Sequence, residues 1–440
     1  MRSERCCKFS CLVLLVLIAL SSRAFSSDTY VVVGPTYNCV GHYAWVKTIN
    51  QALAAVKGAT YAVIDVCPGT YTEQVVISQS LTLIGVKGGS QNAAVIVPPT
   101  TGVVANTVDV DTGNPIAAQI LVQNTAGPVS ITNLTVDGTG NQISGCSPDL
   151  HGILFQNASG TVDHVAVRNQ IPAGVPSGCQ IGEGIFVQTA TGFTSTVTVE
   201  TSSVHNYNKN GITGNDPGTK LTATGSYIQG AGVVPSGGAA QNGIQLGYGA
   251  TGQISLNTVI DNIYGDPTVA ASADILLYDT AESSGITVTS NVLGNSQLPI
   301  GLETDFAYGA SEYGDGVTVT TNKIFGTSTY DAIDVCTNGN TVTKNTIYNS
   351  AQSGVHFDDS CSVYYSGPAT GENNTATGNT ILESACAGIL DDWAGAGGNT
   401  YGTETYYTVP FPVANDATSC VLPGAGPAHP KTAYKFSPKK

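Results

Sequence analysis

Charged residues are scarce in this sequence. Asp, Glu, Lys and Arg make up 11% of its 440 residues, whereas ordinary soluble domains are about a quarter charged. Methionine occurs once, and Thr, Val and Gly are abundant where a helical bundle would need Leu, Ala, Glu and Lys. The hydrophobic fraction of 41% is too high for a disordered chain. The composition therefore predicts a folded protein that is not a helical bundle.

Basic residues are the rarest charged type. The sequence has 16 Lys and Arg against 31 Asp and Glu, which gives a formal net charge of −15. Arg168 is the only arginine after Arg23. Because nucleic acids and anionic membranes attract proteins through basic patches, we expect no nucleic-acid and no membrane partner.

The first 26 residues have the pattern of a secretory signal peptide. Basic residues begin the chain, and a ten-residue apolar run follows at 11–20. That run is too short to span a bilayer, which takes about 20 residues. Small polar residues come next, as they do before a signal cleavage site. We therefore expect a secreted protein, extracellular or periplasmic, whose mature chain begins near residue 27.

Cysteine usage agrees with export. Eight cysteines remain after the expected signal peptide, and an even number in a secreted chain indicates disulfides. The sequence does not fix their connectivity, and some could be buried free thiols. Pairing of nearest neighbours predicts Cys39–Cys67, Cys146–Cys179, Cys336–Cys361 and Cys386–Cys420.

Two short phrases repeat along the chain. In the first phrase a key position lies between two aliphatic residues, as Leu134 lies between Ile131 and Val136. From residue 134 onward, successive key positions are separated by 23 to 37 residues. The other is usually Gly followed by an aliphatic residue, as in HGILF at 151 and NGIQL at 242. Such spacing is typical of the coils of a β-solenoid, in which every coil buries its aliphatic side against its neighbours.

Asparagine fills five successive key positions. We expect each to adopt a left-handed turn, which Asn tolerates, and the amides to hydrogen-bond one another inside the column. This role is structural. The key asparagines are Asn257, Asn291, Asn322, Asn345 and Asn379.

The two ends of the repeat differ from its middle. Residues 45–56 place Ile49, Leu53 and Val56 at helical spacing, which predicts a short helix covering the first coil. From about residue 400 the phrases stop and prolines accumulate. We expect one β-helix domain at 27–400 and an irregular Pro-rich cap or tail at 401–440.

The sequence TINQALAAV, then CPGTYTEQVVI and LTLIG, followed by the two phrases, resembles the pectin lyase-like superfamily over residues 30–401. The resemblance implies an all-β fold, a single-stranded right-handed parallel β-helix with a short N-terminal capping helix. Members include polysaccharide lyases, glycoside hydrolases, pectin methylesterases, epimerases, tailspikes and adhesins, so the fold does not assign the function. The resemblance also places the active face on the outer side of the sheet formed by the Gly–aliphatic strands.

The family's mechanisms fit the sequence unequally. The segment from Gly69 to Glu73 looks like the start of a pectin methylesterase, but the arginine that this mechanism needs is absent after Arg168. The Gly-His-Gly and Arg-x-Lys motifs of polygalacturonase-like hydrolases are also absent. A calcium-assisted lyase remains an alternative for which no motif is present.

Strand phase predicts a candidate site. Alternate residues of a strand face the same side, so two outward columns follow if the aliphatic residue of each Gly–aliphatic phrase points inward. The early coils are neutral in both columns. The first column reads Leu154, Phe186, Thr213, Gln245, Leu276, Glu303, Asp334, His356 and Leu390. The second reads Gln156, Gln188, Asn215, Gly247, Tyr278, Asp305, Cys336, Asp358 and Asp392.

The acidic residues of the late coils support three interpretations. A carboxylate pair could hydrolyse a glycosidic bond: Asp305 with Asp358 suits the inverting separation, and Asp358 with Asp392 the retaining one, while His356 assists. The oxygens could instead bind Ca²⁺. The third interpretation is a solvated acidic face. The candidate catalytic residues are Glu303, Asp305, Asp334, His356, Asp358 and Asp392.

These observations favour a secreted, monomeric protein that acts on a neutral or weakly charged polysaccharide and requires no cofactor. The alternative from a different class is a non-catalytic solenoid, either adhesive or structural, that binds a glycan or another partner at its Thr- and Asn-rich faces.

Overall fold

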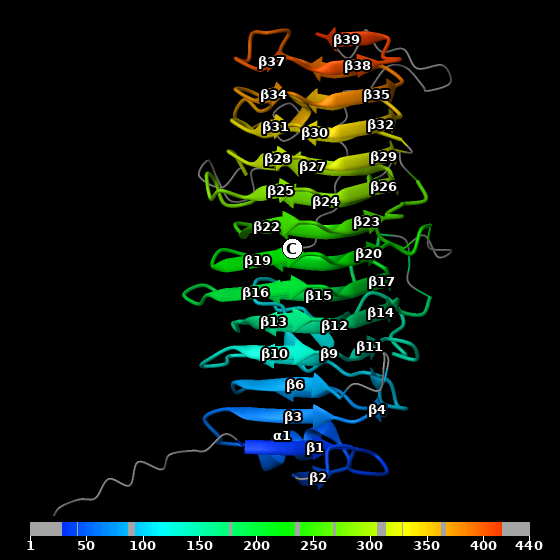
Figure 1. Ribbon diagram of the computed structural model, residues 1–440, viewed down its shortest axis with the longest axis vertical. Coiled ribbons are helices and arrows are strands. Elements are labelled where there is room, and N and C mark those ends of the chain that lie inside the picture. Colours follow the sequence, from blue (N-terminus) through cyan, green and yellow to red (C-terminus); the bar gives the residue numbers. More distant parts are fainter. Residues whose placement is uncertain are drawn as a thin grey trace, which may run out of the picture.

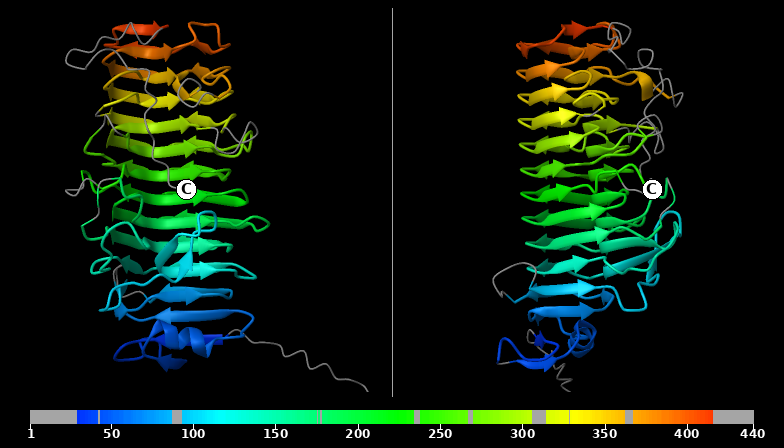
Figure 2. Two further views of the ribbon diagram at one scale, coloured as in Figure 1. Left: turned by 180° about the vertical axis from the view of Figure 1, so that it is seen from behind. Right: turned by 90° about the vertical axis from the view of Figure 1, so that its right-hand side faces the viewer.

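The computed structural model describes residues 29–41, 43–86, 93–174, 176, 178–233, 238–266, 270–305, 314–327, 329–361 and 367–415. Strands stack into one elongated column, seen from three directions in Figures 1 and 2. The expected signal peptide and residues 416–440 lie outside the described residues. Within the described ranges, no helix has the length and hydropathy needed to cross a membrane.

Three long sheets run along the column, and their strands are parallel (Figure 1). In spatial order, the first sheet contains β2 (Ala44–Val46), β1 (Thr29–Val33), β3 (Ala62–Val66), β6 (Leu81–Gly85), β10 (Val129–Thr132), β13 (Gly160–Asp163), β16 (Ser195–Glu200), β19 (Thr219–Thr224), β22 (Thr251–Ser255), β25 (Thr287–Thr289), β28 (Thr318–Thr320), β31 (Thr341–Thr343), β34 (Thr375–Thr377) and β37 (Thr400–Gly402).

The second sheet contains β4 (Gly69–Thr72), β7 (Ala94–Val97), β11 (Thr135–Asp137), β14 (Ala166–Gln170), β17 (Ser203–Tyr207), β20 (Tyr227–Gln229), β23 (Thr258–Ile260), β26 (Val292–Ser296), β29 (Lys323–Thr327), β32 (Thr346–Ser350), β35 (Thr380–Ser384) and β38 (Thr405–Tyr407). The third contains β5 (Val75–Ile77), β9 (Pro115–Gln123), β12 (Asp149–Gln156), β15 (Glu183–Gln188), β18 (Asn210–Asn215), β21 (Asn242–Gly247), β24 (Ala273–Tyr278), β27 (Leu298–Glu303), β30 (Ile333–Val335), β33 (Val355–Phe357), β36 (Ala387–Asp391) and β39 (Phe411–Ala414). The predicted parallel β-helix is confirmed.

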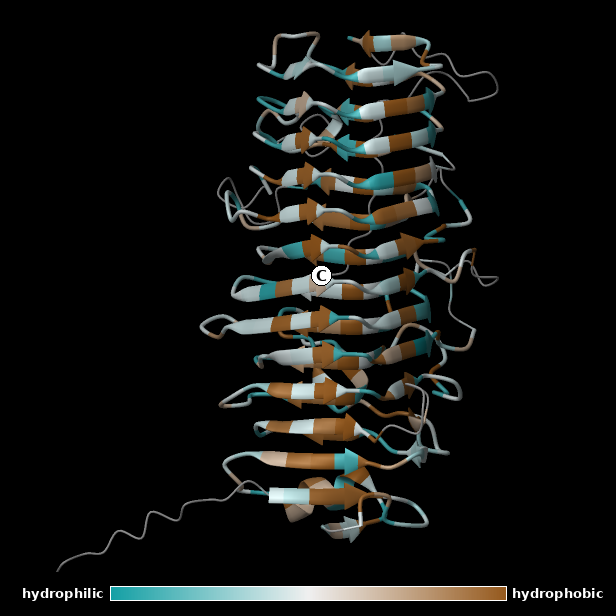
Figure 3. Ribbon diagram, viewed as in Figure 1, coloured by the Kyte–Doolittle hydropathy of each residue, from teal (hydrophilic) through white to brown (hydrophobic). Residues whose placement is uncertain are grey.

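The core is built by stacking like residues from successive coils. In the third sheet, Ile212 pairs with Ile244, Ile244 with Ile275, and Ile275 with Ile300, and all four are fully buried. Burying an isoleucine contributes about 1.5–3 kcal/mol. Figure 3 shows the resulting alternation of hydrophobic and hydrophilic residues along the strands. No coil can bury this surface alone, so the coils depend on one another.

The Gly of the Gly–aliphatic phrase is required by close packing. A Cβ on Gly184 would lie 2.4 Å from a methyl carbon of Val204 in the core. The corresponding Ala332 is fully buried in the same core. Both this position and the following aliphatic residue therefore point inward, so the simple alternation of the strand is broken there. The residue immediately before the Gly consequently faces outward.

The predicted asparagine ladder is present. The Asn322 side chain donates to the Asn345 side-chain oxygen at 3.0 Å and accepts from the Asn291 side chain at 3.0 Å. The prediction that these asparagines are left-handed is wrong, because positive φ occurs at the preceding residues, such as Thr321 (57°) and Lys344 (57°). The preceding residue makes the turn, and the asparagine is free to hydrogen-bond along the column.

The predicted helical cap is α1 (Ile49–Ala55). Its N-cap residue Thr48 accepts from the Gln51 amide at 3.1 Å. Glu73, which lies between β4 and β5, accepts from the amides of Ile49 at 2.8 Å and Asn50 at 3.0 Å. A carboxylate is favourable at a helix N-terminus. The glutamate of the methylesterase-like segment thus attaches the cap to the column.

Three of the predicted disulfides are present, Cys39–Cys67, Cys146–Cys179 and Cys336–Cys361. The fourth predicted pair stays a prediction, because Cys420 lies outside the described residues. The column also extends further than the expected boundary at residue 400, since β37, β38 and β39 form one more coil that ends at Ala414. Its aromatic and Pro-rich sequence does not match the phrases of earlier coils, yet it pairs in the same register.

Candidate functional site

The late coils bring six ionisable side chains together on the outer face of the third sheet. We call this group the acidic cluster: Glu303, Asp331, Asp334, His356, Asp358 and Asp392. The strands β27, β30, β33 and β36 and the residues that flank them position these side chains. Register pairs Asp334 directly with His356 on the next coil.

The expected columns are wrong by two residues at β27. Ile300, rather than Leu302, pairs with the inward isoleucines of both neighbouring coils. Gly301 therefore occupies the first-column position, Glu303 lies in the second column, and Asp305 falls beyond the strand. The Gly–aliphatic phrase selected Gly301–Leu302, whereas the inward residue is Ile300, which follows Pro299. A shift of two residues preserves the face, so Glu303 still points outward.

Asp305 belongs to a different interaction from the one expected. Its backbone amide donates to Asp279 Oδ1 at 3.0 Å, and the Thr304 hydroxyl donates to the same oxygen at 2.6 Å. Burial raises the pKa of Asp279 to about 8, and a hydrogen bond with the Asp305 side chain adds to the rise. The largest charges that act on Glu303 are those of Asp334 and Asp358. The pairing of Asp305 with Asp358 stays a prediction.

His356 lies between carboxylates at both ring nitrogens. Its Nδ1 is 3.2 Å from Asp331 Oδ2 and 3.8 Å from Asp334 Oδ1. Its Nε2 is 3.1 Å from Asp392 Oδ2. The imidazole is almost fully buried, and so are the carboxyls on its Nδ1 side, whereas the Asp392 side chain retains 15% exposure. The Nε2 side of the ring is therefore the side nearer to solvent.

Asp392 is the most exposed member of the cluster, and the neighbouring Asp358 is almost fully buried. Asp358 accepts from the Ser360 amide at 2.7 Å and from the Ser360 hydroxyl at 2.7 Å, which fixes its orientation. Asp392 Oδ1 has no hydrogen-bond partner among the described residues. Ligand atoms of Asp358, Asp392 and His356 lie within 4.8 Å of one another. The two carboxylates are thus close enough to act on the same bond.

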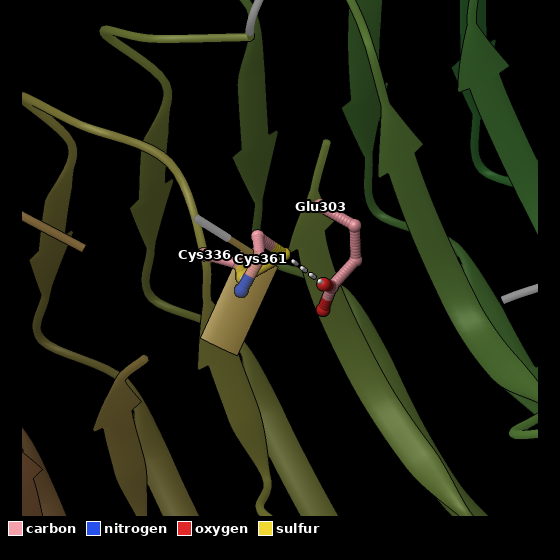
Figure 4. A group of neighbouring side chains, drawn as sticks. All are labelled: Glu303, Cys336 and Cys361. Atoms are coloured by element: carbon pink, nitrogen blue, oxygen red, sulfur yellow. Dashed lines mark hydrogen bonds between the residues drawn. A yellow bond between two sulfur atoms is a disulfide. The ribbon is translucent and has the colours of Figure 1, made fainter. Parts of the chain in front are cut away.

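Glu303 lies against the Cys336–Cys361 disulfide (Figure 4). Its Oε2 is 3.4 Å from Cys361 Sγ, and its Oε1 has no hydrogen-bond partner among the described residues. A disulfide sulfur has no hydrogen to donate, so this contact does not stabilise an ionised carboxylate. The surroundings favour a protonated Glu303.

Burial and neighbouring charge shift the pKa of three cluster groups. Burial raises the pKa of Glu303 well above its usual value, and the charges of Asp334 and Asp358 raise it further. Burial, followed by the charge of Asp358, likewise raises the pKa of Asp334. For His356, burial acts to lower the pKa, but the charges of Asp358 and Asp392 outweigh it and the pKa is raised. Burial and like charge therefore favour the protonated forms of Glu303 and Asp334, and neighbouring carboxylates favour the protonated form of His356.

Sequence reasoning missed Asp331. The columns counted only residues after the inward aliphatic residue, but the inward position of Ala332 turns the preceding residue outward. The same rule applies to His151 and Glu183, which precede the Gly of their phrases and pair with each other in register. A third outward column before the Gly would have identified all three.

Outside the two columns, which are neutral as expected, the early coils contain buried ionisable groups. His151 Nε2 lies 2.8 Å from Asp149 Oδ2, and the His151, Glu183 and Lys209 side chains are fully buried. Burial raises the pKa of Glu183 to about 7 and lowers that of Lys209 to about 7, and the attraction between their charges opposes both shifts. Lys209 Nζ donates to the Ala240 carbonyl at 2.8 Å. Because substrate cannot reach fully buried groups, this cluster has a structural role.

A short crossing segment covers part of the early coils. β8 (Thr107–Val108) pairs antiparallel with β9 on the outside of the column (Figure 2). The turn after β8 is held by the Gln188 side chain, which donates to Asp109 Oδ2 at 2.7 Å. Burial raises the pKa of Asp216 to about 9, and a hydrogen bond with Asp111 of this turn adds to the rise. The turn is thereby attached to the third sheet at β15 and to Asp216 after β18.

Several groups in the structure have the ligand types of a metal site. The groups are Glu303 with Cys336 and Cys361, Asp149 with His151 and Glu183, Asp331 with Asp334 and His356, and His356 with Asp358 and Asp392. The first is excluded because its sulfurs form a disulfide and offer no thiolate. Calcium prefers about six to eight oxygen ligands, and each of the other three groups consists of two carboxyl groups and one imidazole.

No protein-family model and no curated protein matches the sequence. Solved structures do match. The catalytic domain of a GH87 α-1,3-glucanase in complex with nigerose has a TM-score of 0.56 and 14% identity, covering 88% of this chain and 68% of that one. The A-module of the mannuronan C-5 epimerase AlgE4 from Azotobacter vinelandii has a TM-score of 0.54 and 15% identity, covering 86% and 95%.

A GH136 lacto-N-biosidase from Eubacterium ramulus has a TM-score of 0.54 and 10% identity, covering 88% of this chain and 68% of that one. These proteins are right-handed parallel β-helices, so the pectin lyase-like fold expected from the repeat phrases is confirmed. Identities this low show the fold alone and assign no catalytic residue.

Proposed function

We propose that the protein is a secreted glycoside hydrolase that cleaves a neutral polysaccharide at the Asp358–Asp392 pair. The single observation that carries this proposal is the proximity of these two carboxylates, whose ligand atoms lie within 4.8 Å of each other and of His356. Glycoside hydrolysis uses two carboxyl groups on opposite sides of the scissile bond. The similar solved structures include a glucanase and a lacto-N-biosidase, which supports a polysaccharide or oligosaccharide substrate.

The short separation favours a retaining mechanism. Retaining enzymes place their carboxyl groups about 5–5.5 Å apart, and inverting enzymes about 6.5–9.5 Å apart. We assign the nucleophile to Asp392, because His356 holds its Oδ2 at 3.1 Å and its Oδ1 has no partner among the described residues. Oδ1 forms a bond to the anomeric carbon as the glycosidic C–O bond breaks. Asp358 gives a proton to the leaving oxygen, and later removes one from the attacking water.

The remaining cluster residues prepare this pair. Asp334 and Glu303 are almost fully buried, as Asp358 is, and they act on Asp358 through charge. Charge also favours a neutral substrate: in the described coils after residue 300 the only lysines are Lys323 and Lys344, so nothing compensates the carboxylates of a uronate polymer. The displacement needs no cofactor, although calcium could bind the same carboxylates.

Secretion and a monomeric state belong to this proposal. The first 26 residues have the pattern of a signal peptide, and the three disulfides agree with an oxidising compartment. Mass spectrometry of the protein released into the medium tests the cleavage site near residue 27. A mass that retains residues 1–26 would contradict it.

A polysaccharide panel tests the proposal. Purified protein is incubated with neutral α- and β-glucans, galactans, mannans and xylans and with uronate polymers, with and without calcium. Hydrolysis releases new reducing ends without ultraviolet absorption, whereas a lyase produces unsaturated ends. We expect reducing ends from at least one neutral glycan. Unsaturated products would establish a lyase, and binding without turnover would establish the non-catalytic solenoid.

A further inference from the structure

Asp334 is a buried group that the proposed hydrolysis leaves unexplained. Its side chain is fully buried on β30, and neither of its oxygens has a hydrogen-bond partner among the described residues. An unsatisfied buried polar group costs about 1–3 kcal/mol, and more when it is charged. Protonation does not remove this cost, because the added proton would also need an acceptor. The carboxyl is suited to a ligand that satisfies it.

The surroundings of Asp334 identify that ligand as a cation. Asp334 Oδ1 points at His356 Nδ1, 3.8 Å away, and Asp331 Oδ2 lies 3.2 Å from the same nitrogen. Tetrahedral ligands bound to zinc at about 2.1 Å are roughly 3.4 Å apart. The two separations from His356 Nδ1 bracket that value, and ligand atoms of all three residues lie within 4.8 Å of one another. Three donors of the right type are therefore close enough to share one ion.

We propose that Asp331, Asp334 and Nδ1 of His356 bind one divalent first-row transition-metal ion of the Zn²⁺ or Mn²⁺ class. Imidazole nitrogen combined with two carboxylates is a donor set for such ions. Calcium is disfavoured, since it takes about six to eight oxygens and the central donor here is a nitrogen.

Groups around the three ligands support the assignment. A metal-bound histidine usually donates its other N–H to a carboxylate, which fixes the tautomer. His356 Nε2 lies 3.1 Å from Asp392 Oδ2, which provides this partner. Ligating carboxylates are hydrogen-bonded as well, and Asp331 Oδ1 accepts from the Ser353 amide at 2.6 Å. The metal would lie on the buried side of the imidazole, and the hydrolytic pair on the side nearer to solvent.

The proposal is tested by direct metal binding, without glycan. The full-length protein is stripped with a chelator, dialysed, and titrated calorimetrically with Zn²⁺, Mn²⁺ and Ca²⁺ separately. We expect one Zn²⁺ or Mn²⁺ per chain, and weaker binding as the pH falls, because protons compete for the ligands. Binding of Ca²⁺ in place of both, or no binding of Zn²⁺ and Mn²⁺, would overturn the proposal.

Three variants distinguish this site from other acidic groups. Asp334→Asn removes one ligand and should abolish measurable binding, and Asp392→Asn removes the histidine's partner and should weaken binding about 10–100-fold. Asp163→Asn is the matched control, since Asp163 lies on β13 of the first sheet, where its side chain contacts His164, and it should bind like the wild type. Wild-type affinity in folded Asp334→Asn would refute the site.

Circular dichroism establishes that each variant is folded. His356→Gln is a second ligand variant, in case Asp334→Asn does not fold, and it too should lose the ion. Because turnover is not measured, the result does not depend on whether the protein is a hydrolase.

Discussion

Replacing Asn322 by alanine should strongly destabilise the column. The Asn322 side-chain oxygen accepts from the Asn291 backbone amide at 2.9 Å and from its side-chain amide at 3.0 Å. The Asn322 side-chain amide donates to the Val288 carbonyl at 2.9 Å and to the Asn345 side chain at 3.0 Å. All of these bonds lie inside the column, where water cannot replace them.

The magnitude follows from the donors that alanine leaves without an acceptor. Two buried N–H groups of Asn291 lose their acceptor, and each unsatisfied group costs about 1–3 kcal/mol. The free energy of unfolding should therefore fall by about 2–6 kcal/mol. Serine at this position should cost less, because the native Ser226 Oγ already accepts from the Ser202 amide at the same ladder position of an earlier coil.

Urea denaturation followed by circular dichroism measures this effect. The matched control is Asn114→Ala, at an exposed asparagine on the surface turn after β8, where a change within about 0.5 kcal/mol is expected. If Asn322→Ala unfolds at the same urea concentration as the control, the ladder does not stabilise the column and the reasoning is refuted.

Lys209→Met alone should lower the free energy of unfolding by about 3–5 kcal/mol, because it leaves the buried Glu183 carboxyl without its cation. Adding Glu183→Gln should recover at least half of this loss. An equal loss in the double variant would count against the pair. Asp216 has its pKa raised from 3.8 to about 9 in the folded state, so the folded state holds a proton that the unfolded state releases, and stability should fall as pH rises between these values. Asp216→Asn should remove that part of the decline in urea midpoints measured at pH 5, 7 and 9, and parallel profiles for both proteins would refute it. Glu73→Ala removes the acceptor of two α1 amides and should cost about 1–2 kcal/mol, measured by thermal unfolding, with no change if α1 is capped by Thr48 alone.

The fold was predictable from the sequence because a solenoid repeats its constraints. Each coil must place aliphatic residues at the same register, so the phrases recur and their spacing gives the coil length. The ladder asparagines were predictable for the same reason. The backbone conformation of these asparagines was not predictable, because Asn is favoured both at left-handed turns and where a side-chain amide hydrogen-bonds. The structure shows that the left-handed residue is Thr321, which precedes Asn322.

The site was predictable in part. Asp334, His356, Asp358 and Asp392 follow from strand alternation, and the structure brings them together. Asp331 was missed because the small residue after it points inward and breaks the alternation.

Strand alternation could not predict two other features of the outer face of the third sheet. The error at β27 arose because Leu302 follows a Gly and fits the phrase, whereas the inward Ile300 follows a proline. The crossing segment at β8 and the buried charges beneath the early coils depend on long-range packing. The periodicity of residues within a strand predicts neither the crossing segment nor the buried charges.

The central claim is that Asp358 and Asp392 together cleave a glycosidic bond. The most direct measurement is the initial rate of reducing-end release by Asp358→Asn and Asp392→Asn on the glycan that the wild type cleaves fastest, with Asp163→Asn on β13 of the first sheet as the matched control. We predict that kcat falls by about 10²–10⁴-fold in both variants, with unchanged thermal unfolding, while the control retains wild-type activity. Undiminished kcat in the folded Asp358→Asn and Asp392→Asn proteins would contradict the claim.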